Sequence, residues 1–585
     1  MPFQVSPGVN ISEIDLTTVI PAVSTSVGAS VGQFNWGPVD EVTLITSESE
    51  LAGTFGKPTT NNIVDYFTAA NFLDYTNALR VVRVANTGAG GGAKNAAGSA
   101  VNALLIKSDE HFETVDASGS TFYAKYPGVL GNKLKIELCD HAGTEGGTNG
   151  FASWYVNSYF TAAPDTSPYA SRHGGASDEL HIAVIDGDVG EFSGTANAVI
   201  ELFPFVSKAS DAKDENGEDN YFKTVINNRS NYIRIGSPTG HTEATYGKPA
   251  QGQTFGNTAH GRLSAALEGG SDGSSSTGLV PPGTYTAGWD LFADADKVDV
   301  SLIIAGDGGA VNSGDSDRIT VLKHINDNVS SARKDVVAFF SPHKSDTANV
   351  ATDVLKRTAV LSFRNTDTNF NTSYSSMDSG WKYQYNKYTD DYIWMPLNPD
   401  VAGLCARTDK ERDSWWSPAG YNRGQVKNVV RLAYNPTKAH RDDLYRAGIN
   451  PVVSFPGQGT VLFGDKTQLQ RTGAFDRINV RRLFIVLEKA ISTAAKFQLF
   501  EFNDEFTRAQ FRNMVEPFLR DVQGRRGITD YQVICDDTNN PGSVIDRNEF
   551  VGDIYVKPVR SINFIQLNFV AVATGVDFSE IVGKF

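Results

Sequence analysis

A glycine-rich pentapeptide, Gly269–Gly273, matches the G-x-S-x-G pattern of serine hydrolases, in which the serine attacks an acyl group from a sharp turn between a strand and a helix. That chemistry requires a buried strand before the serine and a helix directly after it. Here Ser271 is followed by a run of hydroxyl side chains, Ser274–Thr277, in a segment rich in Gly and Ser. The pattern therefore predicts a flexible loop, and a serine hydrolase that uses Ser271 is only a remote alternative.

Residues 459–467 (GTVLFGDKT) are one residue away from the phosphate-binding loop of nucleotide hydrolases. Such a loop needs small residues with free backbone N–H groups, and a lysine directly after the last glycine. Here bulky side chains fill the interior, and Asp465 precedes Lys466, so that a carboxylate would lie where a phosphate should bind. We predict a β-hairpin here, and neither a nucleotide nor another cofactor.

Histidine and carboxylate side chains show no spacing suited to a catalytic or metal site. None of the nine histidines forms an H-x-x-x-H pair, and His173 and His181 are expected to be polar surface residues. The neighbouring carboxylates Asp390-Asp391 and Asp536-Asp537 are expected on loops or strand ends, where adjacent side chains point apart. We therefore expect no catalytic residue, no metal and no enzymatic activity.

Composition and charge indicate a large acidic protein with well-filled cores. The chain has 585 residues, of which 40% are hydrophobic, and a net charge of −15. Because an acidic chain repels nucleic acid and anionic lipid, neither is expected as a partner. The unpaired spacing of Cys139, Cys405 and Cys535 favours buried thiols in a reducing compartment.

No apolar run reaches the roughly 18 residues of a membrane-spanning helix, and the first residues lack a signal-peptide pattern. We expect a soluble protein made in a cytoplasm, without direct membrane insertion.

Two clusters of side chains could serve recognition. One is aromatic and alternates in part with a period of two, which favours a half-buried strand or an interface over a platform for stacking sugars or bases. It consists of Trp381, Tyr383, Tyr385, Tyr388, Tyr392 and Trp394. The other is a local excess of basic over acidic residues between Arg477 and Arg526. It is either a solvated helix pair with internal salt bridges or a face that docks on an acidic partner.

The elements that would position these residues alternate between strand and helix in the first and middle parts of the chain. Nearly all-apolar strands separated by helices are typical of a parallel sheet covered on both faces. The expected strands are 42–45, 79–84, 298–305 and 335–340, and the expected helices are 63–75, 317–329 and 348–361. Residues 86–100 are mostly small or polar and are expected to be a linker into an insertion.

The last third carries the clearest pattern. A long helix over 479–500 has an apolar face formed by Leu483, Phe484, Leu487, Ile491, Ala494 and Phe497. Asp504 is expected to cap a second helix, with Phe506, Phe511, Met514 and Phe518 as its buried positions. Strands are expected over 529–536, 550–556 and 561–572.

Several motifs, in this order along the chain, resemble those of the contractile phage tail sheath family, and most closely the sheaths of large contractile-tailed phages (myovirus type). They are Ser6-Pro7-Gly8-Val9 with Glu13, Trp36-Gly37-Pro38, Phe55-Gly56-Lys57-Pro58, Leu79–Arg83, Val401–Asp409, Ser417–Gly420, Asn450-Pro451, Arg477–Leu483, Gly552–Pro558 and Ile562–Ile565. The resemblance covers residues 1–84 and about 395–585, and several ordered motifs are specific where one alone would be weak.

The resemblance implies a multidomain α/β and α+β fold, with a C-terminal α/β sheath domain, extended N- and C-terminal arms, and inserted β-rich and α/β outer domains. The implied function is that of a structural subunit. It would form stacked hexameric rings around the tail tube and contract by rigid-body rearrangement, driving the tube through the host envelope during genome delivery. The implied partners are the chain itself, the tail tube protein, and baseplate and tail-terminator proteins. The implied location is the virion tail, after assembly in the host bacterial cytoplasm. The alternative is the sheath of a non-virion contractile injection system or bacteriocin.

The resemblance also suggests which residues contact neighbours. The arms would act through Pro7, Gly8, Val9, Ile11, Ile14, Val576, Phe578 and Ile581. The sheet that accepts a neighbour's strand would contain Ile554, Val556, Ile562, Phe564 and Ile565. The tube-facing candidates are Arg508, Arg512, Arg520, Arg525 and Arg526.

The expected division into domains follows from these assignments. It comprises an N-terminal arm (1–20), a discontinuous core domain (21–85 with 361–475), an inserted β-rich domain (86–205), an inserted α/β domain (206–360), an inner domain facing the tube (476–573) and a C-terminal arm (574–585).

Overall fold

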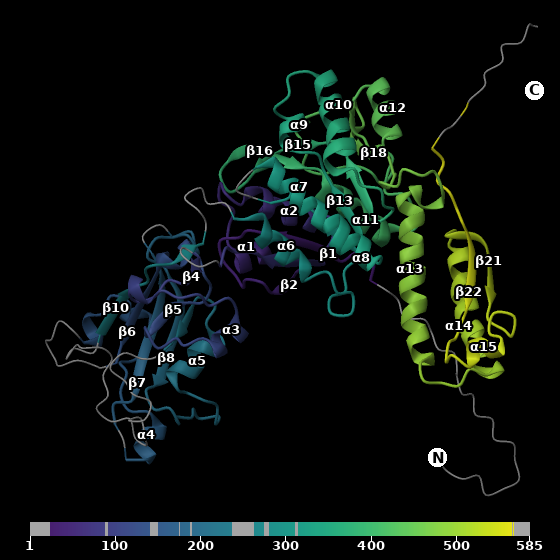
Figure 1. Ribbon diagram of the computed structural model, residues 1–585. Helices are drawn as coiled ribbons and strands as arrows, with labels where there is room; N and C mark the ends of the chain where they lie inside the picture. The colour runs from purple at the N-terminus through teal and green to yellow at the C-terminus, as the bar shows by residue number, and fades with distance from the viewer. Residues whose placement is uncertain are drawn as a thin grey trace, which may run out of the picture. The chain divides into compact units, whose positions relative to one another are not determined.

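The computed structural model describes residues 24–87, 92–140, 150–174, 176–187, 190–236, 262–273, 280–309 and 314–563, together with Gln566 (Figure 1). The described residues divide into two compact units, one within 21–493 and one within 494–585. The predicted arm residues Pro7, Gly8, Val9, Ile11, Ile14, Val576, Phe578 and Ile581 lie outside the described part, as do Phe564 and Ile565.

A seven-stranded sheet is the centre of the first unit. Its strands lie in the order β18-β14-β13-β12-β1-β3-β2, and all neighbours are parallel except β2, which is antiparallel to β3. They are β1 (Gly28–Gly32), β2 (Val42–Ile45), β3 (Leu79–Arg83), β12 (Leu302–Ile304), β13 (Val337–Phe340), β14 (Ser375–Asp378) and β18 (Ile449–Asn450). The predicted mixed α/β class is confirmed, and the apolar runs at 298–305 and 335–340 contain the central strands β12 and β13.

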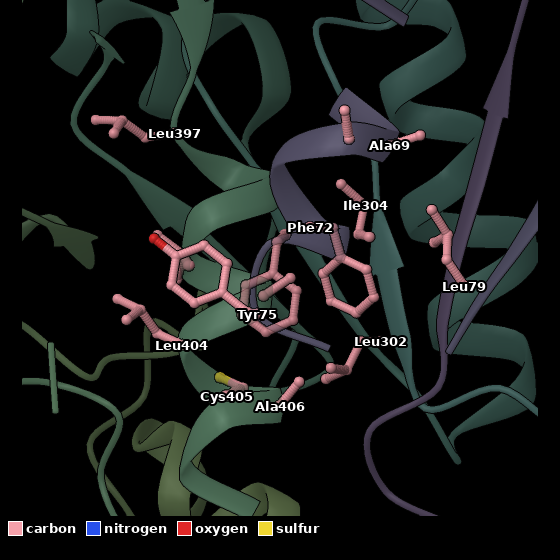
Figure 2. Packing of buried hydrophobic residues seen from close by; sticks show 14 of the residues in the cluster. Ala69, Phe72, Tyr75, Leu79, Leu302, Ile304, Leu397, Leu404, Cys405 and Ala406 are labelled. Atoms are coloured by element: carbon pink, nitrogen blue, oxygen red, sulfur yellow. The ribbon is translucent and has the colours of Figure 1, made fainter. Parts of the chain in front are cut away.

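Helices cover both faces of this sheet, because successive side chains of a strand point to opposite faces. Leu302 and Ile304 pack in one core with helices α2 and α11, whereas Ile303 packs in the other with α6, α7, α10 and α12. Figure 2 shows the first core, where Phe72 of α2 and Ala406 of α11 lie near Leu302. The helices of this unit are α1 (Glu48–Phe55), α2 (Ile63–Leu73), α6 (Pro282–Asp290), α7 (Asp315–His324), α8 (Ser331–Arg333), α9 (Lys344–Thr347), α10 (Asp353–Ser362), α11 (Asn398–Glu411), α12 (Lys438–Arg446) and α13 (Ile478–Ala495). Two π-helical stretches, Ile325–Ser330 and Phe363–Thr368, continue α7 and α10.

An antiparallel sheet with its own core is inserted between β3 and β12. Its strand order is β10-β6-β7-β8, and two smaller ladders, β5 with β9 and β4 with β11, belong to the same stretch of chain. The strands are β4 (Ala93–Lys94), β5 (Phe122–Ala124), β6 (Leu134–Cys139), β7 (Glu179–Asp186), β8 (Val199–Ser207), β9 (Ile233–Ile235), β10 (Arg262–Ala266) and β11 (Ser271–Asp272), and the helices are α3 (Asp109–Thr114), α4 (Pro168–Arg172) and α5 (Phe222–Arg229).

The predicted boundaries of the insertion differ from this topology. The expectation placed a β-rich domain at 86–205 and a separate α/β domain at 206–360. Instead, β10 pairs with β6 and so belongs to the β-rich body, while β12 and β13 extend the sheet begun by β1 and β3. The cause is pairing between strands far apart in the sequence, which local patterns do not encode.

Two small ladders complete the first unit. They are the three-stranded sheet β16-β15-β17 and the hairpin β19-β20. Their strands are β15 (Trp381–Asn386), β16 (Asp391–Pro396), β17 (Arg431–Leu432), β19 (Val452–Phe455) and β20 (Gly459–Leu462).

The second unit combines one long helix with a two-stranded antiparallel ladder, and Figure 1 shows β21 and β22 beside α14. Its elements are α14 (Glu505–Gly524), β21 (Ile528–Ile534), α15 (Gly542–Ile545) and β22 (Asp553–Pro558). The predicted cap is confirmed, because the Asp504 side chain accepts a hydrogen bond from the Thr507 N–H at 2.8 Å.

The predicted burial of the apolar positions on the two long helices is only partly correct. Phe511 and Met514 are buried, but Phe506 and Phe497 are exposed. Both side chains lie next to the turn between α13 and α14. The apolar spacing of the helices continues into this turn, but no described residue of the unit buries these two side chains.

Candidate interaction surfaces

Ser271 lies in a short strand and not in the predicted loop. It pairs with Lys94 across the β4–β11 ladder, and its Oγ accepts a hydrogen bond from the Gly273 N–H at 3.1 Å. The next residue, Asp272, accepts from the Val129 N–H at 3.0 Å. The ladder explains why this glycine-rich stretch is ordered, and Ser271 does not stand at a strand-to-helix elbow.

The segment that resembles a phosphate-binding loop forms the predicted hairpin, because β20 pairs antiparallel with β19. Lys466 Nζ donates to the Tyr445 carbonyl at 2.8 Å. The buried Asp465 carboxylate lies 3.2 Å from Arg477 and accepts from Ser417 Oγ at 2.9 Å. Both ionisable groups of the motif are therefore used to hold the chain together.

His181 is buried, contrary to the expectation of a surface residue. Its ring stacks on Phe160 and meets Phe205 edge-on, and its Nδ1 accepts from the Phe205 N–H at 3.0 Å. Burial lowers the pKa of His181, which favours the neutral ring. His173 is exposed, as expected.

The three cysteines are buried, as predicted, and none of them is in a disulfide bond. Burial raises the pKa of Cys405 to about 12, so its thiol is unreactive. Among the described residues, no group of three or more His, Cys, Asp or Glu side chains is arranged to hold a metal ion. In the same part of the chain, no helix combines the length and the apolar character needed to cross a bilayer.

The carboxyl ends of the parallel strands meet at one edge of the central sheet, the place where α/β enzymes bind ligands. Here the edge is occupied by polar side chains of the protein itself. Asp65 Oδ2 accepts from the Gln33 N–H at 2.8 Å and from the Tyr285 hydroxyl at 2.6 Å. Burial, with a smaller contribution from Asp307, raises the pKa of Asp65 to about 7.

Two further buried carboxylates extend this polar edge. Asp378 accepts from Ser341 Oγ at 2.6 Å and from the Gly380 N–H at 2.9 Å, and burial raises its pKa to about 8. Asp400 forms a fully buried ion pair with Lys382 at 2.9 Å. These contacts join β13, β14, β15 and α11, so the edge functions as an internal polar core and not as an open ligand site.

The aromatic cluster forms one face of the sheet β16-β15-β17. Tyr383 lies opposite Trp394 and Tyr385 lies opposite Tyr392, while the Arg431 guanidinium lies 4.7 Å from the Tyr383 ring centroid. Tyr385 and Tyr392 are exposed, so the structure has the predicted half-buried strand pair. The other two members are held internally: the Trp381 indole N–H donates to the Pro342 carbonyl, and the Tyr388 hydroxyl bonds to that of Tyr66.

The basic stretch is largely neutralised by internal pairs. In the first unit Arg482 is buried and paired with Asp409 at 2.5 Å, and Arg481 pairs with Glu488 at 3.2 Å. In the second unit Arg508 is buried and paired with Asp537 at 2.6 Å.

Arg508 therefore does not present an exposed charge, in contrast to the expectation. Arg520, Arg525 and Arg526 are exposed and Arg512 is half-buried, so these four are the basic side chains of the predicted set that a partner can reach.

The β21–β22 ladder is the candidate strand-accepting sheet. Ile554 and Val556 alternate with the exposed Tyr555 and Lys557, so the two predicted apolar residues lie on the half-buried face. Ile562 is exposed and follows the ladder. Within residues 494–563 the ladder has two strands only, and each strand therefore has one edge without a strand partner.

Three family models match this chain. They are described as the phage tail sheath protein central domain, matching residues 283–468, the phage tail sheath C-terminal domain, matching 470–571, and the tail sheath protein Gp18 domain III N-terminal region, matching 25–84.

Relatives match over nearly the full length. The tail sheath protein of Vibrio phage KVP40 is 35% identical, and that of Enterobacteria phage T4 is 33% identical, each over 99% of both chains. Among solved structures, the crystal structure of a sheath tail protein from Desulfitobacterium hafniense covers 95% of this chain and 100% of its own, at 10% identity and a TM-score of 0.49.

Proposed function

This chain belongs to the phage tail sheath protein family, and from that premise we propose that it polymerises as stacked hexameric rings around a tail tube and contracts to drive the tube through the host envelope. The observation that carries the proposal is the full-length similarity to curated tail sheath proteins. The role is structural: the motifs that resemble catalytic ones are used for internal contacts, as shown for Ser271 and Lys466.

Strand addition is the proposed link between neighbouring subunits. A two-stranded ladder is only marginally stable alone, and its free edges offer rows of unpaired backbone groups. In this proposal residues 1–20 act as an arm, and about 15 residues in an extended conformation would reach up to about 50 Å, enough to pass to another subunit. Main-chain pairing depends little on side-chain identity, so such links can persist while the subunits rotate as rigid bodies.

We propose that contraction converts the polymer from a state of higher free energy to a state of lower free energy. The chain carries no recognisable fuel-binding motif, so the contracted state must have the more favourable contacts between subunits. The proposed partners are further copies of this chain, the tail tube protein, and baseplate and tail-terminator proteins. The proposed location is the virion tail, after assembly in the host cytoplasm.

The test is to delete residues 1–20 or 575–585 from the full chain. We expect each truncated chain to stay folded and monomeric, as judged by circular dichroism and light scattering, but not to form the sheaths that electron microscopy shows for the intact chain. Normal sheaths from both truncated chains would contradict the strand-addition link. An intact chain that forms no polymer under any assembly condition would contradict the proposed function itself.

A further inference from the structure

The turn between α13 and α14 presents an unusual set of exposed apolar side chains. Within ten residues, Phe497, Leu499, Phe500, Phe502 and Phe506 are all exposed, and Phe500 and Phe502 keep 104% and 84% of their full accessibility. Phe500 also has a φ of 72°, a conformation that costs free energy for a bulky residue. We call residues 497–506 the aromatic tip. A monomer gains nothing from such exposure, which marks a surface that a partner covers.

The aromatic tip is also acidic. Glu501, Asp504 and Glu505 are exposed and alternate with the phenylalanines. A matching surface must therefore combine apolar contact area with positive charge.

The first unit has a surface with that chemistry, in the loop after α11. Two arginines lie close to the Trp416 ring, with the Arg412 guanidinium 5.7 Å and the Arg423 guanidinium 5.3 Å from its centroid. Burial and, to a smaller extent, the neighbouring Arg412 lower the pKa of Arg423, while Glu411 acts in the opposite direction. Two like charges held on one ring are relieved by an incoming carboxylate.

The same surface continues over the β19–β20 hairpin. Tyr421, Phe455 and Phe463 form an aromatic triad with ring centroids 5.5 to 6.1 Å apart. Arg441 lies over both phenylalanines, 5.4 and 5.7 Å from their centroids. Tyr421 and Phe463 are exposed. We call this region, from Arg412 to Phe463, the arginine–aromatic surface.

We propose that the acidic aromatic tip of one copy docks on the arginine–aromatic surface of another copy; this inference rests on the proposed function as a polymer. Aromatic rings would pack on the triad, while Glu501 and Glu505 approach arginines whose stacking already fixes their orientation. Tyr, Trp, Phe and Arg are the side chains enriched at the centres of protein interfaces. Two different surfaces on one chain make a heterologous contact, which is the kind that propagates into a helical polymer.

Cross-linking tests which surfaces meet. Phe502→Cys and Tyr421→Cys are made in separate full-length chains, which have no exposed native thiol because the three cysteines are buried. After co-assembly and treatment with a short bifunctional thiol cross-linker, we expect covalent dimers in the mixture and not in either variant alone. The matched control replaces Tyr421→Cys with Tyr159→Cys, another exposed tyrosine, and should give no dimer. Normal polymers without dimers in the test mixture would overturn the proposal.

Charge reversal tests whether the contact supports assembly. Glu501→Arg with Glu505→Arg, or Arg412→Glu with Arg441→Glu, should each raise the concentration needed for polymerisation about tenfold or more. The chain carrying all four substitutions should recover, because each contact then has both charges exchanged. A control with Glu113→Arg and Glu215→Arg, which reverses two exposed acidic residues elsewhere, should polymerise normally.

The outcomes separate this inference from the proposed function. Failure of the unmodified chain to polymerise contradicts the proposed function. Normal assembly of the tip variant, or no recovery in the fourfold variant, overturns the docking of copy on copy. A tip variant that polymerises normally but no longer binds the tail tube protein would assign the tip to the tube instead.

Discussion

The buried carboxyl of Asp65 links the stability of the first unit to pH. It accepts two hydrogen bonds at one oxygen, from the Gln33 N–H and the Tyr285 hydroxyl, in a site from which water is excluded. Burial raises its pKa to about 7, whereas an aspartate in an unfolded chain titrates near pH 3.9. Between about pH 4 and pH 7 the folded state therefore binds more protons than the unfolded state, and the free energy of unfolding falls as the pH rises.

Asp65→Asn should remove this part of the pH dependence. The amide oxygen can still accept both hydrogen bonds, and the group no longer ionises. We expect the free energy of unfolding of the variant to change less between pH 4 and pH 7, by up to about 4 kcal/mol for a shift of three pKa units. Urea unfolding followed by tryptophan fluorescence measures it, because all seven tryptophans lie between residues 36 and 416, in the first unit. Asp327→Asn, at an exposed aspartate, is the control; equal slopes for Asp65→Asn and the unmodified chain would contradict the prediction.

The sequence pattern predicts the buried apolar strands of the central sheet, but it does not predict the buried polar residues around Asp65. Ile303 and Phe339 belong to short apolar runs, and such runs alone indicate a buried strand. Asp65, Tyr285 and Asp307 come from three distant segments, and each has an ordinary local context. Only the tertiary fold brings them together, so no local pattern could indicate a buried network or the burial of His181.

At the scale of elements, the β21–β22 ladder should change most when subunits join. Among residues 494–563 the outward-facing backbone groups of the two edges have no strand partner, while the inward-facing ones pair with the other strand of the ladder. If a neighbour's arm adds a strand, the outward groups of at least one edge become hydrogen-bonded.

We therefore expect amide hydrogen exchange in Ile528–Ile534 or Asp553–Pro558 to slow on polymerisation, by about tenfold or more. Mass spectrometry of the monomer and the polymer measures this, with the buried strand β12 of the central sheet as an internal reference. Equal exchange of both strands in the two states would show that the arms pair elsewhere. The chain lacking residues 1–20 and 575–585, which we expect to stay monomeric, should exchange under assembly conditions at the rate of the free monomer in both strands.

Element positions could largely be predicted, but their grouping into domains could not. The predicted helix at 63–75 and strand at 79–84 correspond closely to α2 and β3. The predicted domain boundary at residue 360 is wrong, because β12 pairs with β1, more than 250 residues earlier in the chain, and β13 pairs with β12. The apolar spacing predicts core positions for Phe497 and Phe506, because an apolar helical position has the same pattern whether the chain itself or a partner covers it.

At the scale of the whole molecule, charge is distributed unevenly. The chain carries a net charge of −15, yet Arg512, Arg520 and Arg526 are accessible on and just after α14. Arg512 and Arg520 lie on one stripe of the helix, one turn to each side of Glu516, so the three arginines leave this strip with a net positive charge. On an acidic protein, such a basic strip attracts an acidic partner surface, and we propose that the tail tube protein carries that surface.

Reversing these three arginines to glutamate should weaken binding to the tail tube protein and leave the contacts between sheath subunits intact. Exposed charge pairs contribute up to about 1 kcal/mol each, so three reversals should lower tube affinity on the order of tenfold to a hundredfold at low salt. The difference should shrink as salt is added, because screening acts on exposed charges. Co-sedimentation of tubes with the variant at rising salt measures the affinity, and polymerisation without tubes checks the subunit contacts.

A control with the same change in net charge on the first unit reverses three lysines to glutamate, at Lys213, Lys223 and Lys297. Tube affinity equal to that of this control would assign the basic strip another role, whereas loss of polymerisation in the absence of tubes would place it between sheath subunits.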